Sequence, residues 1–248
     1  MDENVQQFNK YIERGPYHWR ELSGGIKRYN AHLAARYEVS IDIIIKHCSG
    51  ANIIIDIGCG DGVFTTMLAE RYGEGTIKGF DYDDTAIKLA KEMTRSKCLS
   101  NLLFVKGNAF DQIKNADLIT ATDVIEHIVM PERFMEDSYK SLKSNGYLFL
   151  STPVKSNEMP ADKYHIREFE FKELKDFTMS FGFTVIDHIS SHDVSYLNRY
   201  KHVFRSGIIK LMPYKYFYNM LALLLGVNVF GKPSCLNPTM QYILLKKT

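Results

Sequence analysis

Residues 53–62 read Ile-Ile-Ile-Asp-Ile-Gly-Cys-Gly-Asp-Gly, and this stretch decides the fold of the chain. Its apolar, β-branched first half predicts a buried parallel strand that stops at a tight glycine turn, and a helix follows over 63–72. Because glycine lacks a Cβ, such a turn lets the backbone approach a ligand closely at the open end of the sheet. The order of strand, glycine turn and helix therefore indicates a nucleotide-binding corner.

The charge of this turn indicates which ligand it accepts. A P-loop needs Lys and then Ser or Thr after its glycines, and a dinucleotide fingerprint needs the spacing Gly-x-Gly-x-x-Gly. Neither is present, because Val63 stands where the dinucleotide pattern requires glycine. Asp56 and Asp61 make the turn acidic, so it repels phosphate. S-adenosylmethionine, which carries a sulfonium and an ammonium group, suits such a turn.

Strands and helices alternate along most of the chain. The predicted strands cover 52–57, 76–80, 102–106, 117–121, 147–151, 184–189 and 239–246, and the predicted helices cover 4–14, 26–47, 63–72, 85–96, 131–142 and 170–180. This alternation predicts an α/β fold built on a doubly wound, mostly parallel sheet of seven strands.

The glycine turn resembles the first motif of class I S-adenosylmethionine-dependent methyltransferases, in the branch of small-molecule and ubiquinone-type O-methyltransferases. Residues 142–153, Leu-Lys-Ser-Asn-Gly-Tyr-Leu-Phe-Leu-Ser-Thr-Pro, look like the segment after the fourth strand of these enzymes. The resemblance covers about residues 45–190 and the last strand. It implies a Rossmann-like sheet, S-adenosylmethionine as cofactor and methyl transfer as the reaction.

The cofactor pocket is expected at the carboxyl ends of the first four strands. Asp81 follows the second strand, at the place where an acidic residue hydrogen-bonds ribose hydroxyls in doubly wound sheets. The resemblance implies that Asn108 reaches the adenine amino group, although Gly-Asn is also ordinary turn chemistry. The expected cofactor-binding residues are Asp56, Gly58, Gly60, Gly62, Asp81, Tyr82, Asn108, Ala109 and Thr122.

Candidate catalytic residues follow the fourth and fifth strands. His127 is a candidate general base because an unperturbed imidazole titrates near neutral pH, and His165 can converge on the same pocket. The pattern of Asp123, Glu126, His127 and His165 also looks like the metal-binding set of small-RNA 3′-terminal 2′-O-methyltransferases, and partly like that of ubiquinone-pathway O-methyltransferases. Such a set suits Mg²⁺, Mn²⁺ or Fe²⁺. A bracing role for Glu126 and His127 is favoured over a divalent metal.

Composition limits the partners and the compartment. The net charge of +2 lacks the basic footprint of a nucleic-acid binder, so DNA is not expected and RNA is disfavoured. The four cysteines have no C-x-x-C spacing, which favours a reducing, cytoplasmic compartment. No signal peptide and no apolar run long enough to span a membrane is indicated.

We expect one methyltransferase domain over residues 1–248. Residues 1–47 form an N-terminal helical cover over the cofactor, 48–191 and 238–248 form the sheet core, and 192–237 form an inserted helical lid. Residues 214–230 of the insertion are apolar and aromatic, with basic residues on both sides. They can pack on the domain, cap a substrate, form a homodimer interface, or bring 201–232 into peripheral contact with a membrane.

The expected function is transfer of a methyl group from S-adenosylmethionine, by in-line displacement, to an oxygen of a small molecule, a sugar or a lipid-linked biosynthetic precursor. Two alternatives stay open: a metal-assisted RNA 2′-O-methyltransferase, and a non-catalytic S-adenosylmethionine-binding or scaffold domain. The intact glycine turn together with Asp81 disfavours the scaffold.

Overall fold

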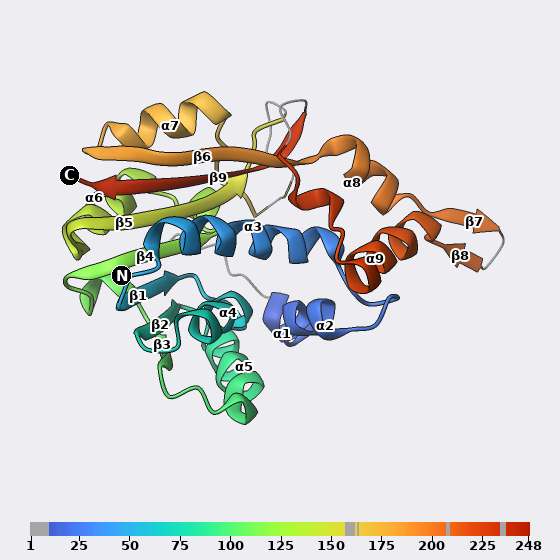
Figure 1. Cartoon of the computed structure of the whole chain (residues 1–248), viewed down its shortest axis with the longest axis horizontal. Coiled ribbons are helices and arrows are strands. Elements are labelled where there is room, and N and C mark those ends of the chain that lie inside the picture. The colour runs from blue at the N-terminus through green and yellow to red at the C-terminus, as the bar shows by residue number, and fades with distance from the viewer. Residues whose placement is uncertain (1–9, 157–161, 163, 207–208, 234–236) are drawn as a thin grey trace.

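A computed structural model of the chain describes residues 10–156, 162, 164–206, 209–233 and 237–248 (Figure 1). Seven strands form one sheet in the order β3-β2-β1-β4-β5-β9-β6, and only β9 runs antiparallel to its neighbours. This confirms the predicted doubly wound, mostly parallel sheet. The strands are β1 (Ile53–Ile57), β2 (Thr76–Asp81), β3 (Leu102–Lys106), β4 (Ala116–Thr122), β5 (Leu142–Pro153), β6 (Phe183–Asp193) and β9 (Pro238–Lys247).

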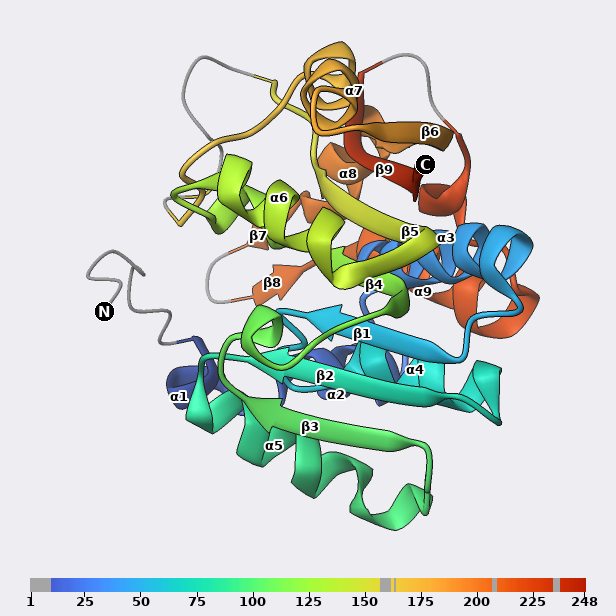
Figure 2. The same ribbon diagram turned by 90° about the vertical axis from the view of Figure 1, so that its left-hand side faces the viewer.

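Helices cover both faces of this sheet (Figure 2). On one face lie α3 (Ala31–Cys48), α4 (Val63–Tyr72) and α5 (Asp84–Thr94), and on the other lie α6 (Pro131–Ser141) and α7 (Phe171–Met179). Alternation along β1 produces the two cores, because successive strand residues point to opposite faces. Ile54 packs with the α3 and α4 side, whereas Ile55 packs with the α6 and α7 side.

Two short helices, α1 (Lys10–Arg14) and α2 (Tyr17–Ser23), precede α3. The first part of the helix predicted over 4–14 lies outside the described residues. The long helix predicted over 26–47 begins only at Ala31, because the Asn30 side chain accepts a hydrogen bond from the Leu33 N–H at 3.1 Å and caps the helix.

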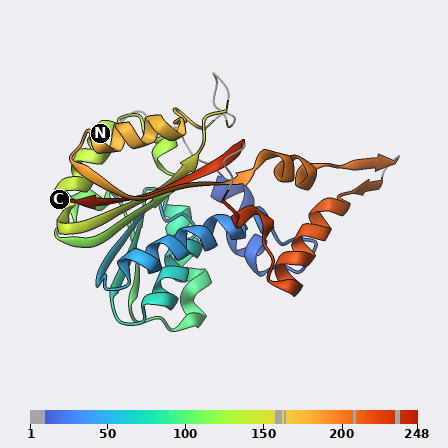
Figure 3. The ribbon, with the colours of Figure 1, turned by 45° about the horizontal axis from the view of Figure 1, so that its top comes forward.

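The insertion leaves the carboxyl end of β6 and returns to the sheet as β9, at the edge where the glycine turn lies (Figure 3). It contains α8 (Val194–Lys201), α9 (Pro213–Leu225) and the 3₁₀ turn η4 (Val229–Gly231). It also contains a two-stranded hairpin, β7 (Phe204–Ser206) and β8 (Ile209–Leu211), which the sequence did not predict.

Asn219 attaches the insertion to the start of α3. Its side-chain N–H groups donate to the carbonyl oxygens of Ile26 and Tyr29, and its oxygen accepts from the Ala31 N–H and the Tyr200 hydroxyl. The residue is fully buried, and its bonds to Ile26, Tyr29 and Ala31 join distant parts of the chain. The insertion is therefore fixed to α3 through one side of α9.

Candidate active site

The glycine turn after β1 is held against the end of β2. The N–H groups of Gly58 and Cys59 both donate to the Phe80 carbonyl oxygen, at 2.8 and 3.0 Å. Gly58 has a φ of +71°, and a Cβ at this position would lie 2.5 Å from Cγ2 of Val124. Glycine is therefore required here both for the backbone conformation and for contact with the segment after β4.

Asp81 ends β2 directly beside this turn. Its Oδ2 accepts from the Gly60 N–H at 2.8 Å, and its Oδ1 accepts from the Asp83 N–H at 2.9 Å. Burial raises the pKa of this carboxyl, while the two N–H donors oppose the rise. Each carboxylate oxygen has a second lone pair, so the group can still accept from a ligand hydroxyl. Tyr82, the next residue, is 58% exposed.

Asp56 lies beneath the turn and not on its open side. The Thr65 hydroxyl donates to its Oδ2 at 2.6 Å, and the Thr120 hydroxyl donates to its Oδ1 at 2.8 Å. The residue is 1% exposed, and this burial raises its pKa to about 7. Asp56 thus ties the end of β1 to α4 and β4.

The remaining expected cofactor residues lie at the ends of β3 and β4. Asn108 caps the 3₁₀ turn η2 (Ala109–Asp111) by accepting from the Phe110 N–H at 3.2 Å, and its amide donates to Asp111 at 3.3 Å. Ala109 is buried, and Thr122 is the last, half-buried residue of β4. These residues share the carboxyl edge of the sheet with the glycine turn.

The N-terminal helices lie directly on the glycine turn. His18 of α2 donates to the buried Asp61 carboxylate from both its backbone N–H (3.1 Å) and its Nδ1 (3.0 Å), and Trp19 donates from Nε1 to the Asp61 carbonyl oxygen at 2.7 Å. A Cβ at Gly60 would lie 2.0 Å from the Tyr11 hydroxyl of α1. Asp61 and its partners were not among the predicted site residues; the grouping of Tyr17, His18 and Trp19 was the only signal.

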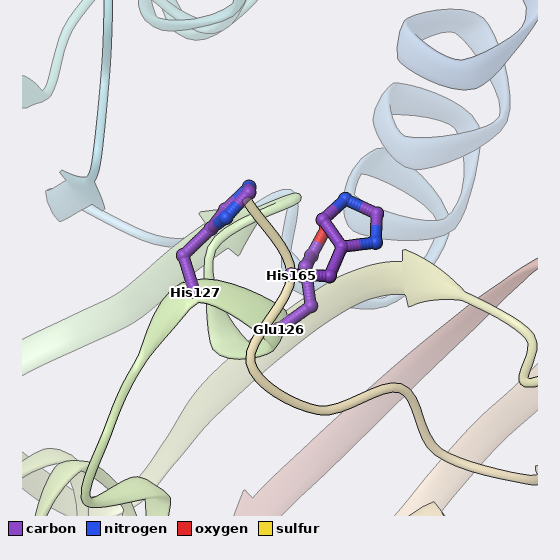
Figure 4. A group of neighbouring side chains, drawn as sticks. All are labelled: Glu126, His127 and His165. Atoms are coloured by element: carbon purple, nitrogen blue, oxygen red, sulfur yellow. The ribbon is translucent and has the colours of Figure 1, made fainter. Parts of the chain in front are cut away.

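Glu126, His127 and His165 come together in the segments that follow β4 and β5 (Figure 4). One potential ligand atom from each lies within 4.8 Å of the others, and the two imidazole centroids are 5.0 Å apart. Glu126 and His127 belong to the 3₁₀ turn η3 (Ile125–His127). The N–H groups of Ile166 and Arg167 donate to the Glu126 carbonyl oxygen, at 2.7 and 3.2 Å, and so hold His165 next to η3.

Hydrogen bonds orient both imidazoles. His127 Nδ1 bonds the Tyr164 carbonyl oxygen at 2.8 Å, so the neutral ring carries its proton on Nδ1 and its lone pair on Nε2. His165 Nδ1 bonds Oε1 of the buried Glu168 at 2.6 Å. Glu126 is 1% exposed, and its Oε2 accepts from the Thr152 hydroxyl at 3.0 Å. Its Oε1 is buried and has no hydrogen-bond partner among the described residues.

Asp123 does not join this group, as the set of four residues would require. It forms an ion pair with Arg36 of α3, and Ser151 donates to its Oδ1 at 3.5 Å. The cause is its backbone: Asp123 has a φ of +55° and precedes η3, so it does not continue the helical turn that would align it with Glu126 and His127.

The chemistry of the three remaining residues fits a metal only in part. Two imidazoles whose Nδ1 atoms are held by oxygen acceptors, next to a carboxylate with an unpartnered buried oxygen, form a donor set known from transition-metal sites. Mg²⁺ prefers oxygen ligands, and the second carboxylate expected for it, that of Asp123, is bound elsewhere. The set therefore suits Fe²⁺, Mn²⁺ or Zn²⁺ better than Mg²⁺.

Comparison with known proteins extends these observations. Residues 37–207, more than half of the chain, match the family model of a methyltransferase domain. A mitochondrial ubiquinone biosynthesis O-methyltransferase of Candida albicans is 31% identical over 103 residues, which cover 40% of this chain and 32% of that protein. A ribosomal protein L11 methyltransferase of Macrococcus caseolyticus is 29% identical over 126 residues, covering 50% and 39% respectively. The match thus spans less than half the length of either relative.

The solved structures agree on the fold. A magnesium protoporphyrin IX methyltransferase from Synechocystis PCC 6803, with S-adenosylhomocysteine bound, has a TM-score of 0.61 and 10% identity over 97% of each chain. Among the described residues, no helix is long and apolar enough to cross a membrane. The family match, the seven-stranded sheet and the acidic glycine turn lead to one conclusion: the chain belongs to the family of class I S-adenosylmethionine-dependent methyltransferase domains.

Proposed function

We propose that this protein transfers a methyl group from S-adenosylmethionine to a hydroxyl oxygen of a small-molecule, sugar or lipid-linked precursor acceptor. The observation that supports oxygen as the acceptor is the orientation of His127 and His165, which lie in the segments that follow β4 and β5. A hydroxyl acceptor must lose a proton, and a neutral imidazole at this place is suited to take it. The relative from Candida albicans is also named as an O-methyltransferase.

In the proposed complex the cofactor lies on the glycine turn. Asp81 accepts from the ribose hydroxyls, with Tyr82 beside it, and the Asn108 and Ala109 segment borders the adenine. Gly58, Gly60 and Gly62 keep side chains out of the cofactor's path, and Thr122 borders the methionine end. Asp56 supports the turn from beneath through Thr65 and Thr120, and we assign it no direct contact with the cofactor.

The proposed reaction is a single displacement. A lone pair of the acceptor oxygen attacks the methyl carbon while the carbon–sulfur bond breaks, and the sulfonium becomes the neutral thioether of S-adenosylhomocysteine. The hydroxyl proton passes to Nε2 of His127, whose Nδ1–H remains bonded to the Tyr164 carbonyl. His165, held by Glu168, borders the acceptor on the other side. The protein contributes mainly position and exclusion of water.

A bound divalent ion would add electrophilic polarisation of the acceptor oxygen, with Glu126, His127 and His165 as its ligands. We do not favour this role, because Asp123, the fourth residue of the expected metal-binding set, forms an ion pair with Arg36 instead. Overnight dialysis against EDTA separates the two cases. We expect full turnover after dialysis; loss of turnover that one divalent cation restores would contradict the metal-free assignment.

The experiment that tests the function measures S-adenosylhomocysteine formation with a panel of phenols, sugars and hydroxylated lipids, and identifies the product by mass spectrometry. We expect an O-methylated product. His127→Ala should lower kcat by about 10²- to 10⁴-fold, the usual contribution of general base catalysis, with cofactor affinity unchanged. The matched control is His47→Ala, a half-buried histidine of α3 that pairs with Asp187. Methylation only at nitrogen, or equal turnover of the two variants, would refute the proposed role.

The relatives leave the acceptor open, since one is named for ubiquinone biosynthesis and the other for a ribosomal protein.

We propose the cytoplasm as the compartment, because Cys48 and Cys59 are buried free thiols and Cys98 is an exposed one.

A further inference from the structure

One side of the inserted helix α9 is apolar and exposed. Phe217, Met220 and Leu224 are 50%, 38% and 67% exposed, and their spacing of three and four places them on one stripe. The opposite side, with Tyr218 and Asn219, is the one buried against α3. The exposed apolar residues of the insertion are Tyr196, Phe204, Leu211, Tyr214, Phe217, Met220, Leu223, Leu224, Leu225 and Val227. We call these ten residues, which come from α8, β7, β8, α9 and the turn after α9, the α9 face.

Beyond Asp193 at its start, the insertion carries only positive charge. Residues 194–237 contain no Asp or Glu, whereas the chain as a whole is nearly balanced at +2. The basic residues are Arg199, Lys201, Arg205, Lys210, Lys215 and Lys232. All except the half-buried Lys215 are exposed, and none forms an ion pair with a carboxylate among the residues that the structure describes. The combination of basic side chains and exposed apolar residues therefore distinguishes the insertion from the rest of the molecule.

The position of the element leaves it accessible. In Figures 1 and 3, α8, β7, β8 and α9 extend beyond the sheet at one end of the molecule. That end adjoins the carboxyl edge of the sheet, where the candidate active site lies. The 13 residues of α9 are too few for the roughly 20 residues that a spanning helix needs, so a lipid contact here would lie in the plane of the interface.

We propose that the α9 face and its basic residues form a docking surface for a lipid bilayer with anionic headgroups. Apolar side chains enter the boundary between headgroups and acyl chains, while the Lys and Arg side chains contact lipid phosphates. The charge pattern disfavours a second copy of the chain as the occupant, because a two-fold contact would bring two sets of cations together. RNA is a poorer match, because only four of the ten residues are aromatic and the other six are Leu, Met or Val, which offer bases no stacking surface.

Flotation of the full chain with vesicles tests the proposal. One set of vesicles contains phosphatidylcholine alone, and the other contains about one third phosphatidylglycerol. We expect the protein to float with the anionic vesicles, to float less as salt is raised, and to stay at the bottom with neutral vesicles. Failure to float with anionic vesicles at low salt would overturn the proposal, whatever the enzyme's acceptor proves to be.

Two sets of variants separate the apolar and the electrostatic contributions. Lys201→Gln, Arg205→Gln and Lys210→Gln together should lower the partition coefficient about a hundredfold, since each basic residue contributes about fivefold at an anionic surface. Phe217→Asp with Leu224→Asp should abolish flotation. The matched controls are Lys78→Gln, Lys114→Gln and Lys140→Gln for charge, and Leu103→Asp, a 50% exposed residue of β3, for apolar surface. If the control variants lose flotation as much as the α9-face variants do, membrane binding is not localised to the α9 face.

Analytical ultracentrifugation and gel shifts address the other occupants. The wild-type protein should sediment as the same species over a wide concentration range, and it should bind single-stranded RNA no better than the charge-control variant does. A dimer that Phe217→Asp dissociates would identify the α9 face as a self-interface and overturn the proposal. Tight RNA binding that the triple Gln variant loses would overturn it in favour of a nucleic-acid surface.

Discussion

Asp56 illustrates at the residue scale how burial changes the role of a charged side chain. Its two oxygens each accept a hydrogen bond from a threonine hydroxyl, and no basic side chain forms an ion pair with it among the described residues. Removal from water disfavours the carboxylate, and this raises the pKa to about 7 from an ordinary value of 3.8. The protonated carboxyl therefore contributes to the free energy of unfolding at low pH. This contribution is lost as the pH rises through about 7.

Asp56→Asn should therefore stabilise the protein at pH 8 relative to wild type, by more than about 1.4 kcal/mol, the equivalent of one pKa unit. At pH 5 the difference in unfolding free energy between the variant and wild type should be smaller, because the wild-type carboxyl is then neutral. Urea unfolding at both pH values measures this, with Asp42→Asn on the exposed side of α3 as the control. A variant less stable than wild type at pH 8 would show that the carboxylate is needed in its ionised form.

At the scale of elements, the N-terminal helices α1 and α2 contact the glycine turn. Trp19 is the only tryptophan of the chain, and its indole N–H donates to the Asp61 carbonyl within that turn. Lys97 also lies over its ring, 5.6 Å from the centroid. A cofactor that settles on the turn must change the surroundings of this indole, so Trp19 is an intrinsic reporter of binding.

Titration with S-adenosylhomocysteine should shift or quench the Trp19 emission, with the same midpoint as calorimetry gives. Trp19→Phe should lose the signal and weaken cofactor binding by about 1 kcal/mol, the typical contribution of one hydrogen bond. Unchanged emission at saturating ligand would place the cofactor away from the cover.

The elements also show what a sequence can and cannot predict. The strand at 53–57 and the glycine turn were predictable, because periodicity and backbone freedom are local properties. That His127 and His165 lie near each other was predictable because both follow neighbouring parallel strands. The left-handed conformation of Asp123, which directs it to Arg36, was not, and neither was the contact of His18 with Asp61, 43 residues away. Such contacts depend on how distant elements pack.

At the scale of the whole molecule, buried histidines link the insertion and sheet to α3 and couple folding to pH. His192, at the end of β6, is fully buried and bonds the Tyr242 hydroxyl at 2.6 Å, and its ring lies 4.8 Å from that of His32. Burial, aided by Arg36 and Lys201, lowers the pKa of His32 to about 3. Burial likewise lowers the pKa of His192 well below its ordinary value.

These histidines stay neutral in the folded protein but gain protons when it unfolds. Their effect on the free energy of unfolding is therefore absent above about pH 6.5, the ordinary pKa of histidine. Below that pH the free energy of unfolding declines. One such histidine accounts for a loss of about 2 kcal/mol between pH 8 and pH 5. His32→Phe should reduce the acid-induced loss by about that amount, measured by urea unfolding, whereas the exposed control His202→Phe should not. Equal losses in the two variants would remove His32 from the account.

The glycine turn, with the Asp81 carboxylate beside it, is expected to accept S-adenosylmethionine and to reject dinucleotides. Calorimetry with S-adenosylmethionine, S-adenosylhomocysteine and NAD tests this most directly, using wild type, Asp81→Asn and the control Asp83→Asn, which caps α5 through the Thr85 N–H. We predict binding of the first two ligands and none of NAD. Asp81→Asn should weaken binding by about 1.5–3 kcal/mol, the range for a hydrogen bond to a charged group, and Asp83→Asn should not. Binding of NAD, or unchanged affinity of a folded Asp81→Asn variant, would contradict the account.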